Sequence, residues 1–458
     1  MSQPRKKNRG RKFKVESLPQ HLQHINVNAA GIDIGAEQHL VAVPEGRDEA
    51  AVREFGAFTA DLQAIADWLA HCGMTTVAME STGVYWIPLF ELLERRGFEV
   101  RLVDARHVKN VSGRKSDVLD CQWLQQLHTY GLLSGAFRPP DEICVLRSYL
   151  RQKEMLTQAS SQHIQHMQKA LQQMNLLLHN VVSDITGVTG MKIIKAILDG
   201  EHDPQVLARN RHGCCHNSEQ TIAKSLVGNY RDEHLFALRQ AVELYETYQN
   251  KIADCEAAII EQLNSYPDTT DNEPPPPAKQ SNASARIRSG VDVREVLFKK
   301  SSVDLFAIPG LGADTLLTVT SEIGFDMSSW KTVKHFTSWL NLCPGTSISG
   351  GKVLTKKVKR KANRAAQAFR IAAATLGRSQ TALGAFYRRI KARSGGIQAV
   401  KATAHKIARI YYTMLTKGTA YCELGQQTYE QKYQERRFAH LQKQAKSLGL
   451  QLVPCTVT

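Results

Sequence analysis

The stretch "AAGIDIGAEQHLVAVP", residues 29–44, decides how the first third of the chain folds. Two apolar runs of strand length flank a short polar turn, which predicts two neighbouring β-strands. A third strand signal follows at 51–58, and helix and strand signals then alternate as far as residue 135. In the first of these helices we expect Thr59 as the N-cap and Gly73 as the stop. The pattern predicts an α/β domain.

From Leu146 onward the pattern becomes that of long helices. Six apolar residues recur at steps of three and four, which suits a helical hairpin or a contact between two copies; they are Ile164, Met167, Leu171, Met174, Leu178 and Val181. A second helical run at 233–263 could be the returning arm of the hairpin. The stretch "DNEPPPPAKQSNASARIRSG" then predicts an extended, exposed linker.

We therefore expect six parts along the chain. They are a basic disordered arm (1–28), the α/β domain (29–140), a helical coiled-coil region (141–265), a Pro-rich linker (266–300), a mostly helical basic domain (301–420) and a tail (421–458).

The basic residues are concentrated in one segment. The net charge is +16, and residues 327–422 hold 19 Lys and Arg but no Asp or Glu. Ordinary protein surfaces carry positive and negative residues in mixture. A long segment with basic residues alone therefore indicates a polyanionic partner. The nine scattered cysteines fit a reducing, cytoplasmic setting. No apolar run reaches 18 residues, and we expect no membrane partner.

Four acidic residues fall where such a domain would bring them together. Three strands followed by α, β, α, β, α is the order of the RNase H-like fold, which carries acids at strand ends. Asp33 ends the first strand, Glu80 ends a later buried strand, and Asp117 and Asp120 share one face at a helix start. Oxygen ligands grouped in this way suit Mg²⁺, with Mn²⁺ as the alternative. Each acid taken alone could instead have a structural role, capping a turn or the N-terminus of a helix.

A candidate nucleophile lies in "CPGTSISGGKVLTKKVKRKANR", residues 343–364. The stretch resembles a phosphate-binding loop, but Val353 follows Lys352 where that loop needs Ser or Thr for Mg²⁺. Ser349 precedes two glycines, so the backbone can approach a phosphate there and leave the hydroxyl exposed. Ser349 is either a nucleophile or an ordinary turn serine. Ser347 is a rival nucleophile.

Further residues are predicted to contact nucleic acid. The turn "IPGLG" at 308–312 resembles that of a helix-hairpin-helix, whose backbone N–H groups bind phosphate, although a plain turn between helices fits the same residues. The predicted contact residues are Arg114, Lys115, Gly310, Gly312, Lys352, Lys356, Lys357, Lys359, Arg360, Lys361, Asn363 and Arg364.

Several motifs together resemble one family. "GIDIG", "MESTGVYW", "GRKSDVLDCQWL", "IPGLG" and "LCPGTSISGGKVLTKKVKRKANRAAQAFR" look like the DEDD transposases of bacterial mobile elements, the insertion-sequence 110 family and its 1111 subgroup. The resemblance spans about residues 29–420. It implies a RuvC-like RNase H fold whose four acids are Asp33, Glu80, Asp117 and Asp120, and a catalytic serine at Ser349. It also implies a composite site that unites two domains joined by a coiled coil.

The resemblance implies a function as well. Family members cut and rejoin DNA through a covalent serine–phosphate bond with Mg²⁺, guided by a structured RNA that pairs with donor and target DNA. They act as homodimers or homotetramers, here in the bacterial cytoplasm in association with the nucleoid. Two alternatives are a RuvC-like two-metal Holliday-junction nuclease, in which water attacks and Ser349 is a bystander, and a non-enzymatic nucleic-acid-binding protein.

Overall fold

The computed structural model describes residues 26–81, 83–103, 117–133, 135–276, 285–343, 347–350, 352–355 and 363–452. The chain divides into two compact units, residues 1–138 and 139–458. The N-terminal unit is mixed α/β and the rest is mostly helical, as the sequence predicts. None of the described helices has the length and apolar composition needed to cross a membrane.

A five-stranded sheet forms the centre of the N-terminal unit, in the order β3-β2-β1-β4-β5. β1 pairs antiparallel with β2 and parallel with β4, and β5 extends the parallel part. The element order agrees with the prediction and is consistent with an RNase H-like fold. The strands are β1 (Ala29–Ile34), β2 (Gln38–Ala42), β3 (Val52–Gly56), β4 (Thr76–Glu80) and β5 (Glu99–Val103).

Alternation along the strands assigns each residue to one face of this sheet. Ile32 of β1 and Val77 and Met79 of β4 pack with α1 (Thr59–His71) and α2 (Trp86–Arg95). Ala78 packs on the opposite face with Leu124 of α4 (Asp117–Thr129). Because side chains alternate, Gly31 and Asp33 belong to the α4 face of β1, and Glu80 belongs to the α4 face of β4.

One detail of the first helix differs from the prediction. Phe58, not Thr59, is the N-cap of α1, and Thr59 is its first helical residue. The Asp61 carboxylate accepts a hydrogen bond from the Phe58 backbone N–H (3.1 Å), which is the part of a capping box that an acid at the third helical position supplies. Gly73, with φ of +68°, follows the helix end as predicted.

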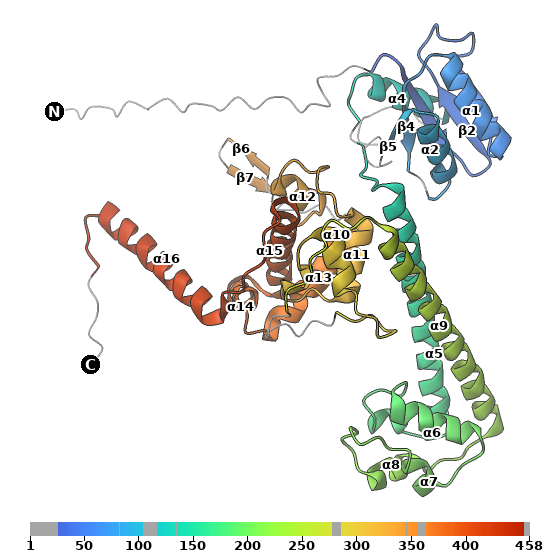
Figure 1. The fold of residues 1–458 in the computed structure, drawn as a ribbon, viewed down its shortest axis with the longest axis vertical. Coiled ribbons are helices and arrows are strands. Elements are labelled where there is room, and N and C mark those ends of the chain that lie inside the picture. The colour runs from blue at the N-terminus through green and yellow to red at the C-terminus, as the bar shows by residue number, and fades with distance from the viewer. Residues whose placement is uncertain are drawn as a thin grey trace. The chain divides into compact units, whose positions relative to one another are not determined.

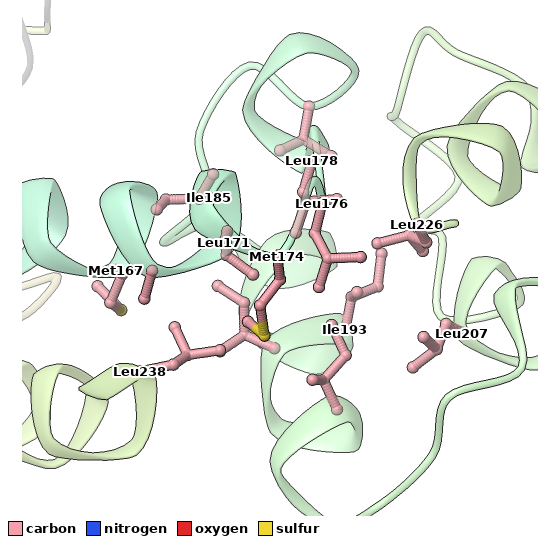
Figure 2. Packing of buried hydrophobic residues seen from close by; sticks show 14 of the residues in the cluster. Met167, Leu171, Met174, Leu176, Leu178, Ile185, Ile193, Leu207, Leu226 and Leu238 are labelled. Atoms are coloured by element: carbon pink, nitrogen blue, oxygen red, sulfur yellow. The ribbon is translucent and has the colours of Figure 1, made fainter. Parts of the chain in front are cut away.

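In the second unit, α5 (Asp141–Gln173) and α9 (Asp232–Ser265) pack side by side as a long hairpin (Figure 1). The apolar residues predicted as one seam do not lie on a single helix, because α5 ends at Gln173 and Asn175 takes a left-handed φ of +57°. Leu178 and Val181 fold back into a small helical core with α6 (Val188–Leu198), α7 (Pro204–Ala208) and α8 (Glu219–Ser225). Figure 2 shows Met167, Leu171, Met174 and Leu178 in this core.

The C-terminal part of this unit surrounds the long helix α15, which packs against α12, α13 and α14. Tyr411 of α15 and Phe369 of α13 are fully buried, with ring centroids 5.6 Å apart. The elements are α10 (Arg294–Ser301), α11 (Ala313–Ile323), α12 (Val333–Trp339), β6 (Ser347–Ser349), β7 (Lys352–Thr355), α13 (Arg364–Thr375), α14 (Ala382–Ser394), α15 (Gly396–Lys417) and α16 (Gly425–Ser447), with short turns at Leu305–Ala307 and Leu376–Arg378. Thus α10 begins inside the segment predicted as a linker.

The tail is a 23-residue helix, α16, that docks only through its first turns. Tyr429 is its one buried residue, and the Arg389 guanidinium of α14 lies 4.0 Å from the ring centroid of Tyr433 and 5.3 Å from that of Tyr429. Cation–π contacts therefore attach α16 to α14.

His128 attaches α4 to β4 through a buried hydrogen bond. The Thr76 hydroxyl donates to the Glu99 carbonyl (2.9 Å) and so accepts from Nε2 of His128 (2.8 Å). Nδ1 of His128 is buried and has no hydrogen-bond partner among the described residues. Burial, with a smaller contribution from Arg101, lowers the pKa of His128 to about 4.

We predict an acid-sensitive contribution of His128 to stability. The unfolded chain takes up this proton near pH 6.5 but the folded one only near pH 4, so stability falls as the pH drops through that window. The shift corresponds to roughly 3 kcal/mol. Urea unfolding of the full chain between pH 4 and 7 should show this loss, and His128→Gln should reduce it. An identical pH dependence in both proteins would contradict the assignment.

Candidate active site

Two of the predicted acids lie at the C-terminal ends of adjacent parallel strands: Asp33 is the penultimate residue of β1 and Glu80 the last residue of β4. Ile32 of β1 is in register with Met79 of β4, so Asp33 and Glu80 are the next residues along each strand. Both belong to the α4 face of the sheet by alternation. Both are half-buried, and both have polar interactions with other groups.

Gly31 brings the third acid to the same edge. A Cβ atom on Gly31 would overlap the Cys121 carbonyl oxygen and the Gln125 amide nitrogen of α4, so the helix backbone lies directly on β1. The Gln125 side chain also donates to the Ala29 carbonyl (3.3 Å). Asp120, one residue before Cys121, is therefore held beside β1. No apolar pattern in the sequence reveals this contact; the signal is a glycine two residues before Asp33 on the same strand face.

The candidate metal-ligand atoms in this region are carboxylate oxygens. The Cys121 thiol is buried beside the acids, but burial, with smaller contributions from the Asp33 and Asp120 charges, raises its pKa to about 11. The thiol is thus neutral at pH 7 and does not compete as a thiolate ligand. Three carboxylates without thiolate or imidazole are the donor chemistry that Mg²⁺ and Mn²⁺ prefer.

The described carboxylates do not by themselves gather into a metal cage. Within the described residues, no three His, Cys, Asp or Glu side chains are close enough to hold an ion. The side chain of Asp117, the fourth acid and the first residue of α4, lies outside the described part. Like charges repel one another when no cation lies between them.

Ser349 lies at the end of a two-stranded hairpin. Ser349 of β6 pairs with Lys352 of β7 across the two glycines, and Gly350 takes a φ of +56°, as tight hairpin turns require. Ser349 is exposed. Ser347 is on the same strand, and its side chain is outside the described part. The two glycines next to Ser349 have no side chains, so a phosphodiester has room to approach this exposed serine.

Only part of the predicted basic surface can be placed. Arg114, Lys115, Lys356, Lys357, Lys359, Arg360 and Lys361, and the side chain of Lys352, lie outside the described residues. Asn363 is the N-cap of α13 and accepts from the Ala366 amide (2.8 Å). Arg364 forms an ion pair with Glu154 of α5. These last two side chains already have structural partners.

The glycines of "IPGLG" have packing roles. Gly310 takes a φ of +88°, and a Cβ atom there would lie 2.8 Å from the Ala372 carbonyl oxygen of α13. Gly312 is the N-cap of α11, whose first turn carries Asp314 in an ion pair with Lys153 (3.0 Å). The turn thus holds α11 against α13, and an acid lies where a phosphate would meet the helix N-terminus.

We predict that Gly31→Ala displaces α4. The added methyl group meets backbone rather than a flexible side chain, so the expected loss of stability is about 1–3 kcal/mol or more. Calorimetry should show a lower Tm for the N-terminal unit, and Mn²⁺ titration should show weaker binding. Gly135→Ala is the matched control, since a Cβ atom there would lie 4.0 Å from its nearest neighbour. Equal behaviour of the two variants would contradict the close contact.

Two transposase family models match parts of this chain. A transposase family model, DEDD_Tnp_IS110, matches residues 30–176, which include β1, β4 and α4. A second model, for transposases of the IS116/IS110/IS902 family, matches residues 304–388, which include the Ser349 hairpin. A search among curated proteins gave no match. The two models together cover slightly more than half of the chain, which therefore belongs to the IS110 family of transposases.

Proposed function

We propose that this transposase cuts and rejoins DNA through a covalent bond to Ser349, with Mg²⁺ held by Asp33, Glu80, Asp117 and Asp120. The observation that supports the proposal is that Asp33 and Glu80 lie on the same face of the paired strands β1 and β4, with the α4 backbone at Cys121 packed on β1. Mn²⁺ would serve in place of Mg²⁺. The N-terminal unit would then be a RuvC-like RNase H domain, with the α5–α9 hairpin as the coiled coil that joins it to the basic domain.

The carboxylates would act through charge and position. A bound divalent ion supplies Lewis-acid stabilisation of the negative charge that develops on a phosphoryl group under attack. Asp33 and Glu80 are fixed by strand register, while Asp120 is fixed by the contact of α4 with β1. Ligands on strands and a packed helix hold their geometry better than ligands on loops.

Ser349 would exchange one phosphate ester for another. Its Oγ forms a bond to phosphorus, the bond from phosphorus to one nucleotide oxygen breaks, and that oxygen leaves with a proton. The serine proton passes to solvent. A hydroxyl of the strand to be joined later attacks the same phosphorus and releases Ser349 unchanged. Ester exchange conserves the bond, so joining needs no further energy source.

The partners would be donor and target DNA and a structured guide RNA encoded by the same element. Support for polyanionic partners comes from residues 327–422, which hold 19 basic and no acidic residues. Support for the guide RNA comes from the family resemblance of the motifs. We propose a homodimer or homotetramer in the bacterial cytoplasm, associated with the nucleoid.

Covalent trapping distinguishes this reaction from hydrolysis. Labelled DNA should remain attached to the denatured wild-type protein, whereas Ser349→Ala should lose the adduct, with at least a hundredfold lower yield, since the nucleophile is gone. Ser347→Ala is the matched control and should keep the adduct. Cleavage by Ser349→Ala without an adduct would support water attack instead, and loss of the adduct only in Ser347→Ala would reassign the nucleophile.

Metal removal should separate chemistry from binding. With EDTA, or in Asp33→Asn, strand cleavage should fall by two orders of magnitude or more because charge on the phosphoryl group is no longer stabilised. Nucleic-acid binding should change little, since cations outside the carboxylate edge contribute most of it. Gel-shift and cleavage assays on the same samples measure both. Undiminished cleavage in EDTA would contradict the metal's role.

A further inference from the structure

One face of α15 carries cations at regular helical spacing. Lys401, His405 and Arg409 are four residues apart, so they lie along the same side of the helix. At 1.5 Å per residue, Lys401 and Arg409 are separated by about 12 Å along the axis. Arg370 of α13, which packs on α15, lies close enough to Lys401 for their charges to interact. We call Arg370, Lys401, His405 and Arg409 the α15 ridge.

The α15 ridge has no acidic counterpart. Helices α13, α14 and α15 contain no Asp or Glu. Within the described residues, none of the four side chains forms an ion pair with an acid. The neighbouring Lys406 differs, because its ammonium lies 4.7 Å from the Phe386 ring centroid and 5.1 Å from that of Tyr429, in the α16 docking site.

Burial and neighbouring positive charges both disfavour the protonated forms of Lys401 and His405. Burial, then the Arg370 charge, lowers the pKa of Lys401. Burial, then the Arg409 and Lys401 charges, lowers the pKa of His405. Unneutralised cations held together in this way are stabilised by a bound anion. A linear array about 12 Å long matches an extended polyanion better than a compact one.

The ridge also lies near the candidate nucleophile. Helix α12 packs on α15, and the Thr337 hydroxyl of α12 lies 3.2 Å from Sγ of Cys343, which is six residues before Ser349 in the chain. Six residues span at most about 20 Å when fully extended. One turn of duplex DNA is about 34 Å long, so a single duplex segment shorter than one turn can contact the ridge and Ser349 together.

We propose that the α15 ridge binds the sugar–phosphate backbone of the DNA strand on which Ser349 acts, within one helical turn of the attacked linkage. The second half of this statement rests on the proposed function. Lys and Arg contacts to phosphates carry no base information, so the ridge sets the position of the strand rather than the choice of sequence.

The test is the salt dependence of binding, measured in the Ser349→Ala background so that chemistry does not intervene. The variant Lys401→Gln/Arg409→Gln should bind duplex DNA roughly tenfold more weakly at low salt, and the log–log salt slope should shrink by about 0.9 for each lost contact. Fluorescence anisotropy with one labelled duplex across a series of NaCl concentrations measures both.

Two controls keep the result interpretable. Lys443→Gln/Lys446→Gln removes the same charge from the exposed part of α16 and should leave the salt slope unchanged. If this variant loses as much DNA affinity as the ridge variant, the effect comes from net charge alone and the proposal is overturned. Lys401→Arg/Arg409→Lys keeps both charges and should bind as the parent does. If it fails as the Gln variant does, the loss comes from the fold and the proposal falls.

Two further measurements test separately whether the α15 ridge prefers DNA to RNA and whether it lies near Ser349. A duplex RNA of the same length should be affected less than DNA, and a loss confined to RNA would overturn the assignment to DNA. With Ser349 restored, ridge variants should form less covalent adduct at subsaturating DNA and recover at saturation. If the ridge variants bind DNA more weakly but form as much adduct, the ridge is a phosphate site far from Ser349, and its proposed position is wrong. If the parent protein itself forms no adduct, the proposed function is refuted instead.

Discussion

The contact between Gly31 and α4 is the constraint on which the candidate active site depends. Only a residue without a Cβ atom lets the helix backbone at Cys121 and Gln125 lie on β1. That contact holds α4, which carries Asp120, on the strand that carries Asp33, while the parallel register of β1 and β4 places Glu80 on the neighbouring strand. The buried His128–Thr76 hydrogen bond fixes the far end of the same helix. Strand register and one glycine thus position acids that are distant in the sequence.

Much of the N-terminal unit could be predicted from sequence because its signals are local. The apolar run in "AAGIDIG" and the helical spacing at 59–73 each depend on neighbouring residues, and the observed elements follow them. The end of α5 at Gln173 could not be predicted in this way. Met174 and Leu178 continue the helical spacing, yet they pack with α6, α7 and α8, so tertiary contacts override the local pattern. The relative positions of Asp33, Glu80 and Asp120 could not be predicted from local patterns either. They depend on the register of β1 with β4 and on the contact of Gly31 with α4, both of which join segments distant in the sequence.

The basic residues of the C-terminal part differ in what they do. Arg389 and Lys406 attach α16 through aromatic rings, and Arg364 pairs with Glu154. Lys401 and Arg409 have neither kind of partner within the described residues. A count of charges along the sequence indicates a polyanionic partner but does not separate these groups. The packing around α15 separates them, since a cation that already neutralises an acid or covers a ring contributes less to phosphate binding.

The central claim is that the carboxylate edge and Ser349 act on the same phosphodiester. Iron-directed cleavage tests it most directly: Fe²⁺ replaces Mg²⁺ in the assembly with DNA and RNA, and ascorbate with peroxide then generates radicals that cut the polypeptide only near the metal. The account predicts cuts in the β6–β7 hairpin as well as in β1, β4 and α4, with all of them lost in Asp33→Asn. Cuts confined to β1, β4 and α4, with none in the hairpin of any copy, would contradict it.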